Sequence, residues 1–500
     1  MIKNEKIDLA ILLLLSLFLS IYVFLYTYVI SLDGAFQYIP IAKDFVSGLY
    51  GKALGHNQQP LYSFLVASVS RWVSDFELAG KLVSSIFGIL LIFPVYFLGK
   101  RIFDQKIAFY SLLFLAIHPY LRRFSADVLK ESTYLFFLAT AIWFSWRAME
   151  REKRYPFLFI SVLTVIAYLV RPDGIEILLI VLFYILFIKK FGSSVERWKI
   201  IFLLLLPFIV LLLPYLVYLK EIRGEWTFGK AKSIAELLGL GVVSSGVPLV
   251  NKILFNFKKL NLEILSIFHP LYVLFLAIGL IKKFSSHLKE GEKFLISFNV
   301  LHYVVLFLLV LNYTDWNAGE NERTFMLSGR HILPLFIFSI YWVGEGFLTI
   351  NQWIRKKVDS IKLFHPLEPE RRSKIIFVTL LVLIFVIILP KTLKPQRYER
   401  LPEKWAGVWI KNQYGKGKTI FTSAHRVAYY ADGNLEYVDI KKDTIDKIKT
   451  AMREKKALHL VIRERETAYF PEHVIKNNFS EVNRFEGKGM EKIILYKRIQ

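Results

Sequence analysis

Residues 7–30, IDLAILLLLSLFLSIYVFLYTYVI, lead directly into residues 31–50, SLDGAFQYIPIAKDFVSGLY, and this junction decides the fold. The first stretch has 24 residues with a single acid, Asp8, which is enough to cross a hydrocarbon core about 30 Å thick. Asp33 therefore follows the predicted membrane boundary by a few residues. Beyond it, apolar residues recur at helical spacing: Phe36, Ile39, Ile41, Phe45 and Leu49. This pattern predicts an amphipathic helix that lies along the membrane interface.

The composition indicates a polytopic membrane protein, because 55% of the 500 residues are hydrophobic. The net charge of +24 does not predict nucleic-acid binding, since the basic residues lie in short loops between apolar runs, as membrane topology requires. The absence of cysteine excludes disulfides and cysteine catalysis. No small-residue cleavage site follows the first apolar run, so we expect a retained anchor rather than a signal peptide.

Eleven apolar runs predict about eleven transmembrane helices. The runs are residues 7–30, 78–99, 107–121, 128–146, 156–170, 174–188, 200–219, 264–281, 294–311, 331–349 and 375–390. Alternate loops are rich in Lys and Arg, for example residues 100–106, 147–154 and 355–374, which places these loops and the N-terminus in the cytoplasm. An odd number of spans then places the C-terminus outside, in a multi-pass protein of the plasma (inner) membrane.

The long loops are expected on the outer face, at residues 31–77, 220–263 and 312–330. We predict a transmembrane domain over residues 1–390 and a small extracytoplasmic α/β domain over residues 391–500, where apolar runs shorten and charges increase. The expected strands of this domain are residues 419–423, 435–439, 457–463 and 492–497, and its expected helices are residues 402–414, 443–455 and 466–476.

The first candidate for a catalytic residue is Asp33, at the mouth of the first span. The structural alternative is that Asp33 only begins a turn with Gly34. Tyr38, His56 and Gln59 lie on the same predicted loop and are candidate substrate-binding residues, although His56 and Gln59 are equally compatible with ordinary loop positions.

A second group of charged residues lies at the head of the fourth run. Asp127 and Glu131 are four residues apart, which predicts that they share one helix face near the outer boundary. Both are candidate catalytic acids. Arg122 and Arg123 come just before them and either bind substrate or simply pair with these acids.

Two further stretches offer candidate substrate-binding residues. Arg171 and Asp173 belong to an RPDG sequence that closes a short outer turn, most often a purely structural feature. Arg330 and His331 stand at the outer entrance of a span in TFMLSGRHILPLFIF. A guanidinium there offers paired donors to a phosphate, and the alternative is a snorkelling interface arginine. Lys230 and Lys232 lie on a neighbouring outer loop and are candidates to assist.

The order and placement of these motifs resemble a known family. The motifs are the first-loop acid, the Pro-Leu-Tyr stretch at residues 60–62, the acid heading span four, the Arg-Pro-acid-Gly turn and the Arg-x-x-x-Pro entrance at residues 330–334. The chain is similar to polytopic glycosyltransferases with the GT-C fold, in the group of dolichyl-phosphate-mannose protein mannosyltransferases and bacterial aminoarabinose transferases of lipid A. The resemblance covers roughly residues 7–390, with a family-typical outer α/β tail.

This resemblance implies that a sugar moves from a polyprenyl-phosphate carrier to a lipid, glycan or protein acceptor outside the cytoplasm. It also implies that Asp33 is the catalytic acid residue of the first loop. Many members have two successive acids there, whereas this chain has Asp33 followed by Gly34. Asp127 or Glu131 then becomes the expected second acid.

Simple chemistry fits these roles. Transfer of a sugar to a hydroxyl requires a base, for which Asp33 is suited, and donors for the departing phosphate, for which Arg330 is suited. A single displacement inverts the anomeric centre. The sequence has neither a DxD pair nor a histidine cluster at ligand spacing, so we expect no essential metal and no cofactor. The alternatives are a transporter or flippase for a lipid-linked glycan, a glycan polymerase or ligase, and a non-catalytic membrane scaffold.

Overall fold

A computed structural model describes most of the chain, which packs as two units. The described residues are 5–189, 191, 193–227, 247–314, 316, 327–359, 368–440, 442–469 and 472–499. The membrane unit comprises Met1–Tyr22, Ile41–Ala126 and Lys130–Leu393. The tail unit comprises Val23–Pro40, Asp127–Leu129 and Lys394–Gln500. Two short stretches from the transmembrane part of the sequence therefore pack with the C-terminal domain.

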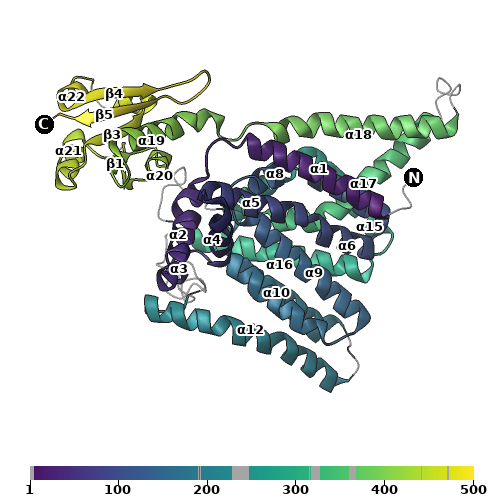
Figure 1. Ribbon diagram of the computed structural model, residues 1–500. Helices are drawn as coiled ribbons and strands as arrows, with labels where there is room; N and C mark the ends of the chain where they lie inside the picture. Colours follow the sequence, from purple (N-terminus) through teal and green to yellow (C-terminus); the bar gives the residue numbers. More distant parts are fainter. Residues whose placement is uncertain are drawn as a thin grey trace. The chain divides into compact units, whose positions relative to one another are not determined.

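Each of the eleven apolar runs is helical over most of its length (Figure 1). The helices that contain them are α1 (Glu5–Leu25), α5 (Phe76–Leu90) with α6 (Ile92–Ile102), α7 (Gln105–Ala116), α9 (Glu131–Arg151), α10 (Pro156–Val170), α11 (Ile175–Phe183) with η3 (Tyr184–Ile188), α12 (Ser194–Arg223), α15 (Pro270–Ser285), α16 (Glu290–Tyr313), α17 (Leu333–Asp359) and α18 (Pro369–Leu393). Within the described residues, six helices are long and apolar enough to cross a membrane, namely α1, the continuous α5–α6 pair, α12, α16, α17 and α18. Shorter apolar helices are α4 (Leu61–Val73), α7 and α10. The predicted largely helical, multi-pass fold is confirmed.

The predicted span at residues 264–281 is divided by a sharp bend. Helix α14 (Leu249–Phe268) and helix α15 meet at 101°, and counting the pair as one span raises the number to seven among the described residues. His269 at the junction has φ +67°, outside the helical region. Pro270 causes the break, because it lacks an N–H to donate and disfavours helical geometry in the residue before it.

Two glycines bring α15 and α17 into direct backbone contact. A Cβ atom on Gly279 would lie 1.9 Å from the carbonyl oxygen of Trp342, and one on Gly346 would lie 1.9 Å from the carbonyl oxygen of Phe275. The contact is reciprocal, since each glycine faces the other helix's backbone. Small residues of this kind allow close packing of helices in a membrane, where apolar burial gives little drive for association. The contact fixes α17, the helix that follows Arg330.

The chain after α1 differs from the prediction. The helix ends at Leu25, whereas the apolar run continues to Ile30. Thr27 instead forms an isolated parallel bridge with Gln396. β-Branched residues such as Thr27 and Val29 lose side-chain freedom in a helix and favour extended backbone. The helical segments that follow are η1 (Gly34–Tyr38), α2 (Ile39–Val46) and α3 (Tyr50–Gly55).

The C-terminal domain contains a five-stranded mixed sheet with the order β2-β1-β3-β5-β4. Its strands are β1 (Thr419–Thr422), β2 (Asn434–Tyr437), β3 (His459–Arg463), β4 (Phe479–Phe485) and β5 (Ile493–Arg498). Strand β1 pairs in parallel with β2 and β3, whereas β5 pairs antiparallel with β3 and β4. The helices are α19 (Leu401–Tyr414), α20 (Arg426–Tyr430), α21 (Ile445–Glu454) and α22 (Glu472–Asn478).

Most of these elements match the sequence prediction, with three differences. Helix α20 is not among the predicted helices. Strand β4 is not predicted, because its burial does not alternate regularly and a register shift interrupts its pairing between Glu481 and Asn483. The helix expected at residues 466–476 is instead divided between η7 (Glu464–Tyr469) and α22.

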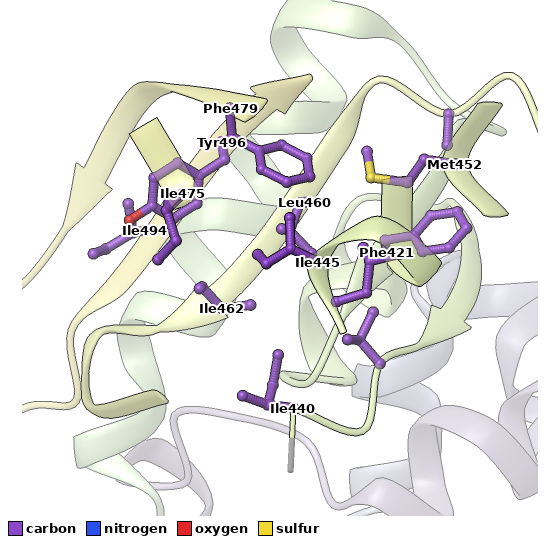
Figure 2. Packing of buried hydrophobic residues seen from close by; sticks show 13 residues of the cluster. Phe421, Ile440, Ile445, Met452, Leu460, Ile462, Ile475, Phe479, Ile494 and Tyr496 are labelled. Carbon is purple, nitrogen blue, oxygen red and sulfur yellow. The ribbon is translucent and has the colours of Figure 1, made fainter. Parts of the chain in front are cut away.

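Alternating side chains of the strands fill two cores, one on each face of the sheet. On one face Phe421, Leu460 and Ile494 pack with Ile445 and Met452 of α21 (Figure 2). On the other face, the residues adjacent to these in the strands pack against α19 and α20. They are Ile420, Val461, Ile493 and Leu495, which pack with Ala406, Ile410 and Val427. This period of two is the signature of a sheet covered on both faces.

Candidate functional site

Asp33 stands at the start of η1, where its side chain is half-buried. The residue after it has no space for a side chain. A Cβ atom on Gly34 would lie 2.8 Å from the Cβ atom of Val128 and 2.9 Å from the Val128 carbonyl oxygen. A second acid directly after Asp33 therefore does not fit, which accounts for the Asp-Gly pair in this chain.

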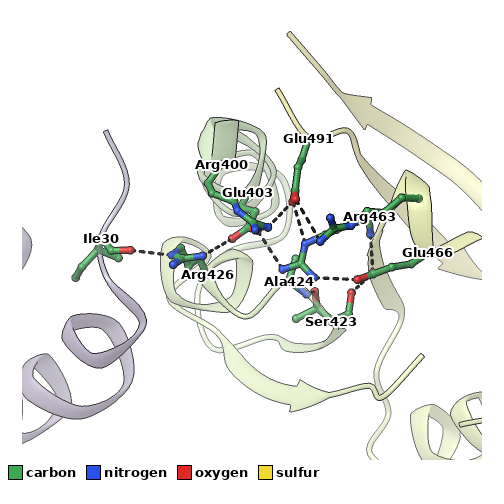
Figure 3. A network of polar contacts seen from close by, with 11 residues as sticks. Ile30, Arg400, Glu403, Ser423, Ala424, Arg426, Arg463, Glu466 and Glu491 are labelled. Carbon is green, nitrogen blue, oxygen red and sulfur yellow. Dashed lines mark hydrogen bonds and ion pairs between the residues drawn. The ribbon is translucent and has the colours of Figure 1, made fainter. Parts of the chain in front are cut away.

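The backbone just before Asp33 is held by side chains of α20. The N–H of Ile30 donates to the Tyr430 hydroxyl at 2.9 Å, and the carbonyl of Ile30 accepts from Nε of Arg426 at 2.8 Å (Figure 3). Both contacts lie within the tail unit. They fix the position of residue 30, three residues ahead of the candidate base.

Asp127 is not on a helix, so the prediction that it shares a helix face with Glu131 is wrong. Helix α8 (Pro119–Ser125) ends before it and α9 starts after it. The reason is local: Oδ1 of Asp127 accepts the N–H of the next residue, Val128, at 2.8 Å. An aspartate that binds its own neighbouring backbone in this way competes with the helical hydrogen-bond pattern.

The carboxylate of Asp127 joins three segments of the tail unit. Its Oδ1 also accepts the N–H of Ser31 at 3.1 Å, and its Oδ2 accepts from the guanidinium of Arg397. Arg397 donates in addition to the carbonyl of Val29 at 2.7 Å. Asp127 is 1% exposed, and its two oxygens accept three hydrogen bonds from protein donors. These contacts hold the segment that carries Asp33.

Glu131, the first residue of α9, has a different environment inside the membrane unit. Its side chain is 1% exposed, and its Oε1 lies 3.9 Å from Nη1 of Arg171 and 3.8 Å from Nε of Arg330. Neither carboxylate oxygen has a hydrogen-bond partner among the described residues. A buried carboxylate without hydrogen bonds is costly unless something else satisfies it. The arrangement therefore leaves acceptor capacity beside two arginines.

Arg171 organises the turn after α10. It forms an ion pair with Asp173, approaches the Arg330 carbonyl at 3.5 Å and lies over the Tyr134 ring at 4.9 Å. Burial disfavours its charge, but Asp173, Tyr134 and Glu131 outweigh burial and raise the pKa of the guanidinium. Arg171 therefore stays charged while 3% exposed.

Glycine is required in the RPDG turn that carries Arg171. A Cβ atom on Gly174 would lie 2.4 Å from the backbone nitrogen of Tyr168. The turn folds back against the end of α10 so closely that a side chain at residue 174 does not fit. Residues 171–174 thus form the tight turn that the sequence predicts, and this turn also positions the guanidinium of Arg171.

A buried histidine–glutamate pair was not identified from the sequence. Nδ1 of His302 lies 2.6 Å from Oε2 of Glu176, and Nε2 of His302 lies 2.9 Å from the carbonyl oxygen of His331. Because a carbonyl only accepts, Nε2 carries a proton, and the short Nδ1 contact requires a second proton between the two groups. The available signal was the presence of ionisable residues within apolar runs, which are expensive in a membrane and usually functional.

The first-loop residues His56 and Gln59 occupy different settings. The His56 ring lies 3.0 Å from Oδ2 of Asp44, and its carbonyl accepts from Arg223 at 2.8 Å. Burial raises the pKa of Asp44, but hydrogen bonds from His56 and Lys52 outweigh this and lower the pKa overall. Gln59 is fully buried in the membrane unit, and Tyr38 is buried in the tail unit.

The other predicted basic residues are distributed over the chain. Arg122 is 2% exposed and donates to the hydroxyls of Ser16 and Ser20 on α1, at 2.7 and 2.8 Å. This contact joins α8 to α1. Arg123 is half-buried, and Nδ1 of His331 lies 3.1 Å from the carbonyl oxygen of Ser328. Lys230 and Lys232 lie outside the described residues.

The structure brings Glu131, Arg171, Asp173 and Arg330 together in one cluster. The pair of His302 and Glu176 is joined to this cluster, because His302 donates to the carbonyl of His331, the residue after Arg330. Over the described part of the chain, no group of three or more His, Asp or Glu side chains is arranged to hold a metal ion. The cluster is therefore an arrangement of paired charges with Arg330 as its partly exposed member, at 29%.

A family model and several solved structures are similar to this chain. A family model for dolichyl-phosphate-mannose-protein mannosyltransferases matches residues 57–218. No curated protein sequence matches the chain. The structure of ArnT from Cupriavidus metallidurans bound to undecaprenyl phosphate is similar, with a TM-score of 0.60 and 12% identity, over 98% of this chain and 98% of that one.

Two further solved structures are similar over the length of this chain. The oligosaccharyltransferase of Archaeoglobus fulgidus in its apo form has a TM-score of 0.57 and 12% identity, over 99% of this chain and 74% of that one. The archaeal oligosaccharyltransferase AglB from Archaeoglobus fulgidus, in complex with an inhibitory peptide and a dolichol-phosphate, has a TM-score of 0.57 and 13% identity, with the same coverage. The chain thus has the GT-C fold, and the family model confirms its resemblance to the dolichyl-phosphate-mannose-protein mannosyltransferases over residues 57–218.

Proposed function

We propose that this protein is a membrane glycosyltransferase that moves a sugar from a polyprenyl-phosphate carrier to an acceptor on the outer face of the membrane. The observation that carries the proposal is the buried Glu131 carboxylate beside the guanidiniums of Arg171 and Arg330. The fold, and the lipid phosphates bound by ArnT and AglB, support this donor class. The acceptor is a lipid, a glycan or a protein.

In this proposal Arg330 holds the phosphate of the carrier. Its side chain is the partly exposed member of the cluster, and its backbone is approached by Arg171. The next residue, His331, accepts a hydrogen bond from His302. A guanidinium fixed in this way presents paired donors to phosphate oxygens and stabilises the charge that develops on the leaving group.

Asp33 is the proposed base. Its carboxylate is half-buried, and the chain before it is fixed through Ile30 and Ser31. It takes the proton of the acceptor hydroxyl as the oxygen attacks the anomeric carbon and the bond to phosphate breaks. A single displacement of this kind inverts the anomeric centre.

Glu131 is the acid that we propose for the cluster of Arg171 and Arg330. Three protein donors, on Ser31, Val128 and Arg397, already bind the oxygens of Asp127. Glu131 has no hydrogen-bond donor among the described residues, so it is able to accept hydroxyls of the sugar. Asp127 then acts as a positioning residue for the segment that carries Asp33.

A transporter for a lipid-linked glycan is the second candidate. The observation in its favour is the buried His302–Glu176 pair, because intramembrane ionisable pairs with shared protons are typical of transport pathways. The sharp bend between α14 and α15 is a second feature found in transporters.

One experiment separates the two functions. The full-length protein is reconstituted into vesicles with an isotope-labelled polyprenyl-phosphate hexose and a crude acceptor fraction of envelope lipids, glycans and proteins. A transferase releases the free polyprenyl phosphate and places the label in the acceptor fraction. Label that crosses the membrane while still attached to its carrier would favour the transporter and refute transfer.

A further inference from the structure

The tail unit contains a pocket at the ends of its three parallel strands. The cavity has a volume of about 420 Å³ and is lined by residues at the ends of the strands: Ser423 after β1, Tyr437–Ile440 at the end of β2, and Arg463, Arg465, Glu466 and Tyr469 at the end of β3. Strand β1 lies between β2 and β3, so the chain leaves β1 for one neighbour and returns across it to the other. Ligands in sheets with parallel strands bind at the carboxyl ends, where the strand order reverses in this way.

The charged groups of the pocket are already paired. Arg463 donates to Glu466 at 2.9 Å and to Glu403 at 3.2 Å, and its Nε lies 3.1 Å from Glu491 (Figure 3). Ser423 also donates to Glu466. The hydrogen bonds from Ser423 and Arg463 lower the pKa of Glu466 although burial alone raises it. The pocket therefore presents a fixed, nearly neutral set of donors and acceptors rather than a positive field for an anion.

Two tyrosines supply flat apolar surface at the same pocket. Tyr437 is 56% exposed and Tyr469 is 54% exposed, although both line the cavity. The Tyr437 ring is stacked on His425 at 4.7 Å and 22°, which fixes its orientation. Aromatic side chains of this kind combine an apolar face with a hydrogen-bonding tip.

We propose that this pocket binds a neutral glycan of one or two hexose units. The C–H face of a hexose ring packs on Tyr437 or Tyr469, and its hydroxyls form hydrogen bonds with the carboxylate of Glu466 and the guanidinium of Arg465. Arg465 lines the cavity with its side chain 65% exposed and is anchored to Glu491 at 3.3 Å. The volume falls within the range of small-ligand sites. This binding site is separate from the roles proposed for Asp33 and Arg330, and it does not require transfer activity.

The test is ligand-observed NMR on the full-length protein in lipid nanodiscs, without any donor. The probes are three neutral disaccharides, mannobiose, cellobiose and diacetylchitobiose, and inorganic phosphate observed by ³¹P line broadening. We expect saturation transfer to the ring protons of at least one disaccharide and no broadening of phosphate. The variants Tyr437→Ala and Tyr469→Ala reduce the affinity by roughly fivefold each, the size expected for one aromatic contact. Arg465→Ala has a comparable effect.

The matched controls lie on the same domain and outside the pocket. Trp405→Ala on α19 removes an aromatic that is 40% exposed, and Arg453→Ala on α21 removes an exposed arginine. Both leave disaccharide binding unchanged. The proposal is overturned if the wild-type protein binds none of the disaccharides, if it binds phosphate instead, or if the pocket variants behave like the controls. Because both tyrosines are exposed, unchanged thermal melting of the variants is expected and confirms that they fold.

Discussion

Nε of Arg330 lies 3.8 Å from Oε1 of Glu131, and the glutamate is almost completely buried whereas the arginine is partly exposed. The pair therefore joins a buried negative charge to a cation that a ligand is able to reach. Nη1 of Arg171 lies 3.9 Å from the same oxygen of Glu131. Asp173 also pairs with Arg171, so the cluster contains two positive and two negative charges, and Arg330 is its partly exposed cation.

Arg330→Ala is expected to weaken binding of the carrier lipid, and Arg330→Lys is expected to weaken it less. Lysine retains the charge but loses the paired donors that match a phosphate. Binding of an undecaprenyl phosphate to the protein in nanodiscs measures the effect, with an expected loss of about 1.5–3 kcal/mol for Ala. Arg71→Ala, on the exposed face of α4, is the control and leaves affinity unchanged. Equal affinities in all variants would make Arg330 an interface anchor only.

Asp33→Asn is expected to fold normally and to lower the transfer rate by 10²–10⁴-fold, the usual effect of losing a general base. The amide retains the size of the side chain but does not accept the proton. Carrier binding changes little, because removing a negative charge does not weaken attraction for a phosphate. The measurement is single-turnover transfer with saturating donor. Near-normal transfer would demote Asp33 to a helix-start residue and direct the same test to Glu131, as Glu131→Gln.

Asp127→Asn is expected to destabilise the tail unit rather than to abolish chemistry selectively. The change removes the charge that Arg397 faces, and losing one charge-assisted hydrogen bond inside a protein costs about 1–3 kcal/mol. The expected readouts are a lower melting temperature and a raised KM for the acceptor, with kcat reduced less than in Asp33→Asn. If the variant melts normally and loses only kcat, Asp127 belongs to the catalytic machinery.

His459 predicts a pH effect on the stability of the C-terminal domain. Burial lowers the pKa of His459 to about 4, assisted by Lys497 and Lys418, whereas the ordinary value is 6.5. Between these values the unfolded chain binds a proton that the folded chain does not, so stability falls as the pH decreases from 6.5 toward 4. The melting temperature of wild type is therefore expected to fall more steeply than that of His459→Gln over this window. His473→Gln, at an exposed position, is the control and follows wild type.

The topology prediction is tested with reporters. A fusion after Gln500 is expected to report an extracytoplasmic position and one after Lys362 a cytoplasmic position, because basic loops stay inside. The reverse result would place Asp33 and Arg330 on the cytoplasmic side and end the proposal of transfer at the outer face.

Local patterns made much of the fold predictable. Apolar runs of sufficient length mark the membrane helices, and short runs rich in apolar and β-branched residues mark strands such as β1 and β3, since both signals depend only on neighbours in the chain. The approach fails where a local pattern is weak or overridden. Strand β4 has a register shift, and the end of α1 is set by the bridge between Thr27 and Gln396.

The sequence by itself determined that this is a multi-pass protein with a C-terminal α/β domain, and it identified Asp33, Asp127, Glu131 and Arg330 as candidates. Only the tertiary structure distinguished their environments. Asp127 and Arg397 meet across 270 residues of sequence, and Glu176 and His302 across 126. The reason is physical. Hydrophobic periodicity is a property of adjacent residues, whereas hydrogen-bond partners come from distant segments that meet only in the folded chain, and they reach the carboxylate of Asp127 but not that of Glu131.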